Sequence, residues 1–206
     1  MLHDLSTVAR LGSRPSVKSG SGEVTPTTSL VIVGYPGSGK STLAKVLGES
    51  AGIRVLEMGD LVRREAAEQS PPNEPMEYAA WVFGRRAPTY FVEILLRDLG
   101  HATQPVIVVG PRRPEELDLI RRSIAPVVCL ALDVSKSVRR RRQRSRLEGP
   151  FHAELTGSWE HRDSVERGWG LDTVINSADH AVNGDEDLDR VAEQARLLWT
   201  GDPPNR

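Results

Sequence analysis

The chain has 206 residues, with 27 lysines and arginines against 28 aspartates and glutamates, so its formal net charge is −1. This length suits one α/β domain with a sizeable core, and the near-neutral balance gives no whole-molecule attraction to nucleic acid. A single cysteine, Cys129, excludes an internal disulfide bond. The sequence shows neither a secretory signal nor an apolar run long enough to span a membrane, so we expect a soluble, cytoplasmic protein.

Residues 1–28 are rich in serine, glycine, threonine and proline and have no sustained hydrophobic period. Such a composition predicts a flexible N-terminal tail. Residues 201–206 predict a second, shorter tail at the C-terminus. Between the two tails, residues 29–200 are expected to form one domain.

The first predicted strand, Leu30–Val33, is a continuous apolar run, and a helix is predicted over Thr42–Leu47. The residues between them fit the phosphate-loop pattern of Gly, four residues and Gly-Lys-Ser/Thr. In such a loop, backbone N–H groups and the N-terminus of the following helix bind phosphate, the lysine reaches the β- and γ-phosphates of ATP, and the hydroxyl ligates Mg²⁺. We therefore expect the lysine to be Lys40, the magnesium ligand to be Ser41, and the nucleotide site to comprise Gly34, Gly37, Ser38, Gly39, Lys40, Ser41 and Thr42.

After this loop, a second strand is predicted over Ile53–Met58, followed by a helix over Leu61–Glu68 with Asp60 as its N-cap. Strands and helices continue to alternate along the rest of the chain. The further predicted helices cover Met76–Phe83, Thr89–Leu99, Glu115–Arg122, Ser137–Leu147, Trp159–Gly168 and Leu188–Trp199, and the further strands cover Val106–Val109, Val127–Leu132 and Ala181–Val182.

This alternation predicts a three-layer α/β/α fold of the P-loop NTPase type, with a mostly parallel sheet between two layers of helices. Ligands of such sheets bind at the carboxyl ends of the strands. The loops at 34–41, 59–63, 110–113 and 133–146 all follow predicted strands and carry arginine or lysine. We expect these loops to meet at one rim around an anionic ligand.

Taken in order, these motifs resemble the nucleoside monophosphate kinase group of P-loop proteins, in particular the adenylate-kinase-like and dephospho-CoA-kinase-like nucleotide kinases. The resemblance covers residues 29–198. Gly34–Thr42 matches the ATP loop of these kinases. Met58–Arg63 is similar to the adenylate kinase segment whose arginine holds the acceptor phosphate, and Gly110-Pro111-Arg112 matches a turn whose arginine also reaches the acceptor.

This resemblance implies phosphoryl transfer from ATP, with Mg²⁺, to a small-molecule nucleotide, in the first place a nucleoside monophosphate, by a monomer or homodimer. It also implies an acceptor-binding part over residues 59–100, a small lid over residues 139–165, and a loop near the adenine after the last strand. The residues given roles by the resemblance are catalytic Lys40, Arg142 and Arg162, acceptor-binding Asp60, Arg63, Arg112 and Arg146, and nucleotide-binding Asn183.

One position departs from the family. These kinases usually carry an aspartate at the end of the strand at Val106–Val109, where it organises water around Mg²⁺, but this chain has Val109. Either Ser41 and the phosphates hold the metal alone, or Asp60 or Asp133 substitutes, or activity is low.

Several alternative functions therefore stay open. The acceptor could be dephospho-CoA or a modified nucleoside rather than a nucleoside monophosphate. The valine at position 109 also fits a regulatory protein that binds ATP without turning it over. The arginine run Arg139–Arg146 fits a solvated helix face or an RNA-binding strip as well as a kinase lid, although nucleic acid is the less favoured partner.

Overall fold

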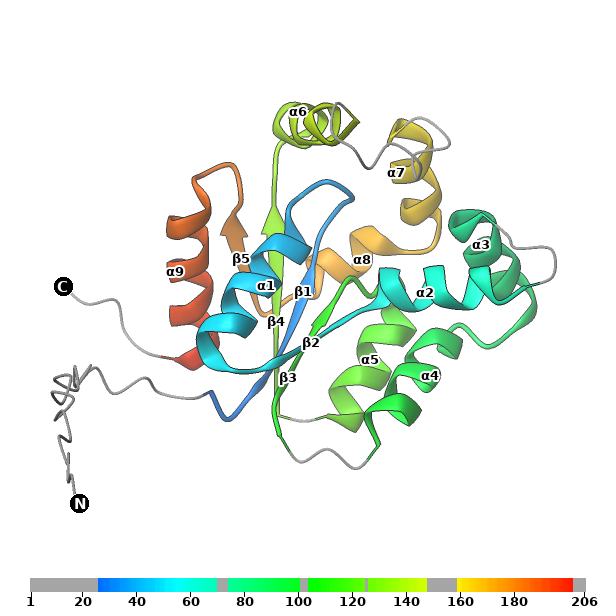
Figure 1. The fold of residues 1–206 in the computed structure, drawn as a ribbon, viewed down its shortest axis with the longest axis horizontal. Coiled ribbons are helices and arrows are strands. Elements are labelled where there is room, and N and C mark those ends of the chain that lie inside the picture. Colours follow the sequence, from blue (N-terminus) through cyan, green and yellow to red (C-terminus); the bar gives the residue numbers. More distant parts are fainter. Residues whose placement is uncertain (1–25, 70–73, 101–103, 125, 148–158, 202–206) are drawn as a thin grey trace, which may run out of the picture.

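The computed structural model describes residues 26–69, 74–100, 104–124, 126–147 and 159–201. Within these ranges, five parallel strands form one sheet in the order β2-β3-β1-β4-β5 (Figure 1). Because β1 is the central strand, the loop that follows it emerges at the middle of the carboxyl rim. The strands are β1 (Ser29–Val33), β2 (Arg54–Glu57), β3 (Val106–Val109), β4 (Val127–Asp133) and β5 (His180–Asn183).

The helices connect these strands and build the rim above them. In Figure 1, α6 and α7 lie above the carboxyl ends of the strands, on the same side as the loop after β1. In the described ranges the helices are α1 (Lys40–Ala51), α2 (Met58–Ala67), α3 (Pro75–Arg85), α4 (Tyr90–Leu99), α5 (Pro114–Ser123), α6 (Lys136–Leu147), α7 (Trp159–Gly168), α8 (Leu171–Asn176) and α9 (Leu188–Thr200).

The alternation of side chains in β1 explains the three layers. Leu30 and Ile32 belong to one hydrophobic core, which includes residues of α1 and α9. Val31 and Val33 belong to the other core, which includes residues of α2, α3, α4, α5 and α8. Because successive side chains of a strand point to opposite faces, a strand buried on both sides must be apolar throughout, as β1 and β3 nearly are. The predicted α/β/α fold is confirmed.

Apart from shifts in the ends of other elements, α1 among them, two elements differ from the sequence prediction in a way that affects the rim. Helix α2 begins at Met58, with Glu57 as its N-cap, so Asp60 lies within its first turn rather than before it. Helix α8 was not predicted; it has only six residues and starts after Gly170, whose φ is 101°. Six residues are fewer than two turns, too few for a helical period to show.

Residues 1–25 of the predicted N-terminal tail, residues 202–206 of the predicted C-terminal tail and residues 148–158 of the predicted lid lie outside the described residues. None of the helices described here is long and apolar enough to cross a bilayer.

Candidate active site

The loop between β1 and α1 has the backbone shape that phosphate binding requires. Gly34 and Gly39 have φ angles of 144° and 98°, which residues with a Cβ rarely adopt. A Cβ on Gly34 would lie 2.7 Å from the carbonyl oxygen of Leu132 in β4. Helix α1 has no side-chain cap and no acidic residue in its first turn. Its N-terminus is therefore available to an anion, which both the free N–H groups and the helix dipole favour.

Lys40 is folded back onto the loop that carries it. Its Nζ donates to the carbonyl oxygens of Gly34 and Tyr35, at 2.7 and 2.8 Å. Burial lowers the pKa of Lys40 to about 8, and nearby arginines act in the same direction, while Glu166 opposes the shift. A bound polyphosphate would offer the ammonium group charged oxygens in place of two neutral carbonyls.

Two arginines of α6 bind the outer side of the phosphate loop. Arg139 donates to the carbonyl oxygen of Pro36 at 3.0 Å, and Arg142 donates to that of Ser38 at 2.7 Å. These bonds engage oxygens that would otherwise repel a phosphate. Two arginines of the run in α6 thus contact the phosphate loop, while Arg140 and Arg144 are exposed.

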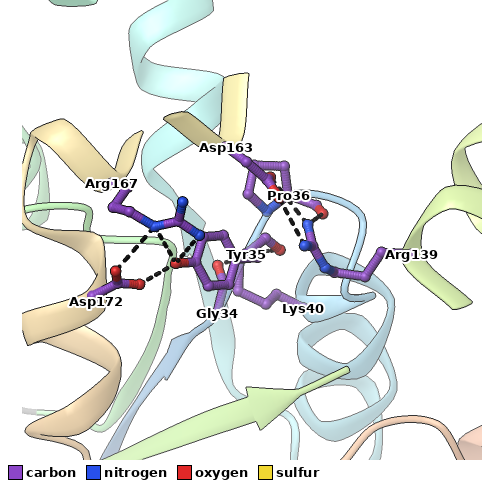
Figure 2. Close-up of polar contacts among 8 residues, drawn as sticks. All are labelled: Gly34, Tyr35, Pro36, Lys40, Arg139, Asp163, Arg167 and Asp172. Carbon is purple, nitrogen blue, oxygen red and sulfur yellow. Dashed lines mark hydrogen bonds and ion pairs between the residues drawn. The ribbon is translucent and has the colours of Figure 1, made fainter. Parts of the chain in front are cut away.

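Arg139 also links α6 to α7 through a buried ion pair (Figure 2). Its two terminal nitrogens lie 3.0 and 2.7 Å from the two carboxylate oxygens of Asp163. Both side chains are almost fully buried, so each charge depends on the other for the solvation that water no longer provides. The same guanidinium holds Pro36, and it therefore joins both helices to the phosphate loop.

Tyr35 provides a second link between this loop and the neighbouring helices (Figure 2). Its hydroxyl donates to Asp172 of α8 and accepts from Arg167 of α7, whose Nη2 lies 3.2 Å away. Burial, together with the hydrogen bond to Asp172, raises the pKa of Tyr35. The guanidinium of Arg139 lies 4.9 Å from the centre of the Tyr35 ring, within the range of a cation–π contact.

A polar pocket of about 540 Å³ opens beside the loop at the carboxyl rim. It brings together seven predicted site residues from four segments of the chain, which shows that the predicted loops do converge. The predicted residues lining it are Gly34, Gly37, Lys40, Ser41, Arg63, Arg112 and Arg162.

Glu166 of α7 organises the arginines of this pocket and was not predicted. The residue is 3 % exposed, and its Oε1 lies 3.3 Å from Nε of Arg112 and 3.1 Å from Nε of Arg162. One buried anion thus holds two cations that the sequence placed 50 residues apart. The spacing of Glu166 four residues after Arg162 is a helical ion-pair signal, although it does not reveal Arg112.

The backbone beside Arg112 is held by a second buried carboxylate. Glu116, in the first turn of α5, accepts from the backbone nitrogens of Arg112 and Arg113 at 2.7 and 3.2 Å. Burial raises the pKa of Glu116 to about 7, although these two hydrogen bonds oppose the shift. Glu116 therefore fixes the backbone of the loop after β3, while Glu166 holds the Arg112 guanidinium.

A second pocket, of about 390 Å³, lies between α1, α6 and the segment after β5. Predicted Ser38, Gly39, Thr42 and Arg142 line it, together with Gly184 and Glu186. Arg142 donates across it to the carbonyl oxygen of Gly184 at 2.8 Å.

Predicted Asn183 lines neither of these two pockets. The side-chain oxygen of Asn183 accepts from the backbone nitrogen of Asp185 at 3.1 Å, within its own loop. Arg146 lies in α6, and its side chain is outside the described part of the chain. The binding roles of Asn183 and Arg146 stay predictions.

The predicted magnesium ligand has an unpredicted partner. The Ser41 hydroxyl donates to Oε2 of Glu57, at the end of β2, at 2.8 Å. Asp60, the expected acceptor or metal contact, instead forms an ion pair with Arg63. Among the described residues, no group of three or more histidine, cysteine, aspartate and glutamate side chains could hold a metal ion by itself. A hydroxyl beside a phosphate site fits Mg²⁺, which binds few protein groups and takes its other ligands from phosphate and water.

A phosphate loop after the central strand of a parallel sheet, with arginines on the same rim, defines a protein with the P-loop kinase fold. Solved structures share this fold. The shikimate kinase from Acinetobacter baumannii in complex with shikimate has a TM-score of 0.58 at 14% identity, covering 89% of this chain and 97% of that one. A sugar kinase from Janibacter sp. has a TM-score of 0.52 at 20% identity, covering 87% and 97%.

Sequence relatives define the family more closely. Residues 33–150 match the family described as an AAA domain. A UPF0200 protein of Methanopyrus kandleri is 32% identical over 182 residues, 84% of this chain and 92% of its own length. A UPF0200 protein of Pyrococcus horikoshii is 31% identical over 163 residues, 74% and 86% of the two chains. The chain belongs to this AAA domain family and to the UPF0200 proteins.

Proposed function

We propose that this protein is an ATP-dependent kinase that phosphorylates a nucleotide, with a nucleoside monophosphate as the acceptor. The observation that carries the proposal is the polar pocket, where the phosphate loop and Lys40 share one cavity with Arg63, Arg112 and Arg162. One lysine and three arginines exceed what a single phosphate group needs. They match a site that holds two anions in line for phosphoryl transfer.

The roles follow from the geometry of the loop and its neighbours. Lys40 leaves the carbonyl oxygens of Gly34 and Tyr35 and neutralises the β- and γ-phosphates. Arg112 and Arg162, oriented by Glu166, stabilise charge on the transferred phosphoryl group and on the acceptor. The second pocket, on the other side of Gly39, suits the base of the donor nucleotide.

Mg²⁺ would be held by the Ser41 hydroxyl and the phosphate oxygens. When bound, the metal ion neutralises charge on the β- and γ-phosphates. The chain itself contributes the orientation of the hydroxyl, because the Ser41 hydrogen is already committed to Glu57 and an oxygen lone pair remains for the ion.

A hydroxyl acceptor, such as dephospho-CoA or a modified nucleoside, is the second candidate. The observation in its favour is the lining of the polar pocket, which contains the carboxylate of Glu166 and, among the residues of the described ranges that line it, no aromatic ring for a base to stack on. A carboxylate could accept the proton that a hydroxyl loses during phosphorylation, whereas a phosphate acceptor needs no such base. One solved structure with this fold is a shikimate kinase in complex with shikimate.

A coupled assay of ADP release tests both candidates. The purified protein, with ATP and Mg²⁺, is offered a panel of nucleoside monophosphates, dephospho-CoA, nucleosides and shikimate. We expect acceptor-dependent turnover with at least one nucleoside monophosphate. Turnover with a hydroxyl compound alone would select the second candidate, and ATP binding without turnover on any acceptor would support the regulatory alternative and reject a kinase.

Two arginine variants separate a catalytic effect from a loss of charge. Arg112→Ala should lower acceptor-dependent turnover roughly hundredfold, as expected when one preorganised cation is lost from a transition state. Arg97→Ala, on the exposed side of α4, removes the same charge away from the rim and should turn over like the wild type. Equal rates for the two variants would contradict the proposed role of Arg112.

A further inference from the structure

The aspartate that this chain lacks would stand at the end of β3. Val109 is the last residue of β3 and is 3 % exposed, and its apolar side chain cannot organise water around a cation. In the parallel pairing of β2 with β3, Val109 is the register partner of Glu57. The two residues therefore end adjacent strands at the same height of the rim, and both line the polar pocket.

Glu57 already contacts the side chain that would bind the metal. Its Oε2 accepts the hydroxyl hydrogen of Ser41 at 2.8 Å. A hydroxyl has one hydrogen to donate and two lone pairs to offer, so this bond turns the lone pairs of Ser41 away from the carboxylate. Glu57 is also the N-cap of α2, but its side chain makes no capping bond, which leaves the carboxylate available to the pocket.

The other carboxylates considered from the sequence are less well placed. Asp60 is exposed and paired with Arg63, and it does not line the polar pocket. Asp133 ends β4 with an exposed side chain and also lies outside the residues that line this pocket. Glu57 is the carboxylate that both lines the pocket and touches Ser41.

We propose that Glu57 organises the magnesium ion of this protein from the end of β2, in place of the aspartate that β3 lacks. The inference rests on the proposed binding of ATP at the phosphate loop. Glu57 orients the Ser41 hydroxyl toward the ion and presents its second carboxylate oxygen to water bound by the ion. Such partners of a metal ligand change metal affinity about 10- to 100-fold when they are replaced.

The test measures binding rather than turnover. Calorimetry gives the Kd of a non-hydrolysable ATP analogue with saturating Mg²⁺ and with EDTA, and the ratio of the two reports how strongly the protein favours the metal-bound nucleotide. We expect the wild type to bind the analogue clearly more tightly with Mg²⁺ than with EDTA. In Glu57→Gln, this gain in affinity should be about tenfold or more smaller. An unchanged gain in Glu57→Gln, or no gain in the wild type, overturns the inference.

Further variants separate contact from charge. Glu57→Asp keeps the negative charge but shortens the side chain. If this variant loses most of the gain in affinity with Mg²⁺, the contact with Ser41 is supported. A gain as large as that of the wild type would indicate a charge effect and overturn the inference. Asp60→Asn tests the competing carboxylate, and a larger loss there than in Glu57→Gln also overturns it. Glu49→Gln, exposed on α1, is the matched charge control and should keep the wild-type gain.

Failure of the wider proposal has a different signature. If the wild type binds the analogue neither with Mg²⁺ nor with EDTA, the proposed ATP site fails and the inference about Glu57 fails with it. If the analogue binds with EDTA but the changes in Kd between Mg²⁺ and EDTA contradict the predictions for the variants, the ATP site stands. Only the role of Glu57 is then rejected. Thermal unfolding of each variant shows that it is folded before it is titrated.

Discussion

At the scale of single residues, the protonation of Lys40 links nucleotide binding to pH. In the free protein its ammonium group is held by two carbonyl oxygens, and desolvation lowers its pKa to about 8. Phosphate oxygens stabilise the charged form and raise the pKa again in the complex. The protein must therefore take up a proton on binding at pH values between the pKa of the free state and that of the complex.

We predict that the affinity for ATP falls as the pH rises above about 8, by up to about tenfold per pH unit. The measurement is calorimetry at pH 9 in buffers of different ionisation enthalpy, which should show an uptake approaching one proton. Lys40→Arg is the control, because guanidinium keeps its proton over this range and should remove the uptake. A wild-type affinity that is constant between pH 8 and 9.5 would contradict this role of Lys40.

At the scale of secondary-structure elements, the phosphate loop is held by helices that lie far from it in the sequence. Arg139 of α6 joins the loop to Asp163 of α7, and Tyr35 joins it to α7 and α8. The position of α6 and α7 is therefore coupled to the shape of the loop that binds phosphate. Helix α7 also brings Arg162 and Glu166 to the polar pocket.

We predict that Asp163→Asn lowers the free energy of unfolding by about 3–5 kcal/mol, because it leaves the buried Arg139 charge without its partner. Arg139→Met combined with Asp163→Leu removes both charges and should recover part of this loss. Urea unfolding measures both variants. Glu160→Gln is a control from the same pair of helices: Glu160 lies 3.8 Å from Arg140 in an exposed pair, and its loss should cost less than about 1 kcal/mol.

A small effect of Asp163→Asn, no larger than that of Glu160→Gln, would mean that the buried pair is solvated in solution. The coupling of α6 and α7 to the phosphate loop through Arg139 would then have to be abandoned.

The bond from Arg139 to Pro36 predicts a further difference. Removing Arg139 alone should weaken nucleotide binding, as well as stability, because it frees one side of the loop.

At the scale of the whole molecule, ligand binding should be visible as global stabilisation. The phosphate loop follows the central strand of the sheet, and the flanking β1 and α1 contribute residues to the hydrophobic cores. A nucleotide that binds only the folded protein adds about 2.7 kcal/mol at a hundred times its Kd. For a domain of this size we expect the melting temperature to rise by roughly 5–11 °C.

Differential scanning calorimetry with ATP and Mg²⁺ measures this rise. Lys40→Ala should abolish most of it, because the lysine is the main cation that meets the phosphates. Lys45→Ala is the matched control: it removes the same charge from an exposed position on the same helix, where the lysine faces Glu49, and it should keep the full rise. Equal shifts in the two variants would place the nucleotide away from the phosphate loop.

The sequence by itself determined the sheet and the phosphate loop. The strands at Leu30–Val33 and Val106–Val109 are runs of apolar and mostly β-branched residues, and the loop is a fixed spacing of glycines before Lys40. Such signals are local, because a few neighbouring residues suffice to specify a buried strand or a curled backbone. The rule that ligands bind beyond the carboxyl ends of parallel strands then brought Arg63 and Arg112 to one rim.

Only the tertiary structure decided how the charges of this rim are paired. Glu57 lies beside Val109 because β2 and β3 are neighbours, and Glu166 meets Arg112 because α7 folds over the rim. Arg139, in a run of similar arginines, is the one that meets Asp163. These contacts join residues that are far apart in the chain, so no local sequence pattern predicts them. A buried charge needs a partner because packing has removed the water that would otherwise solvate it.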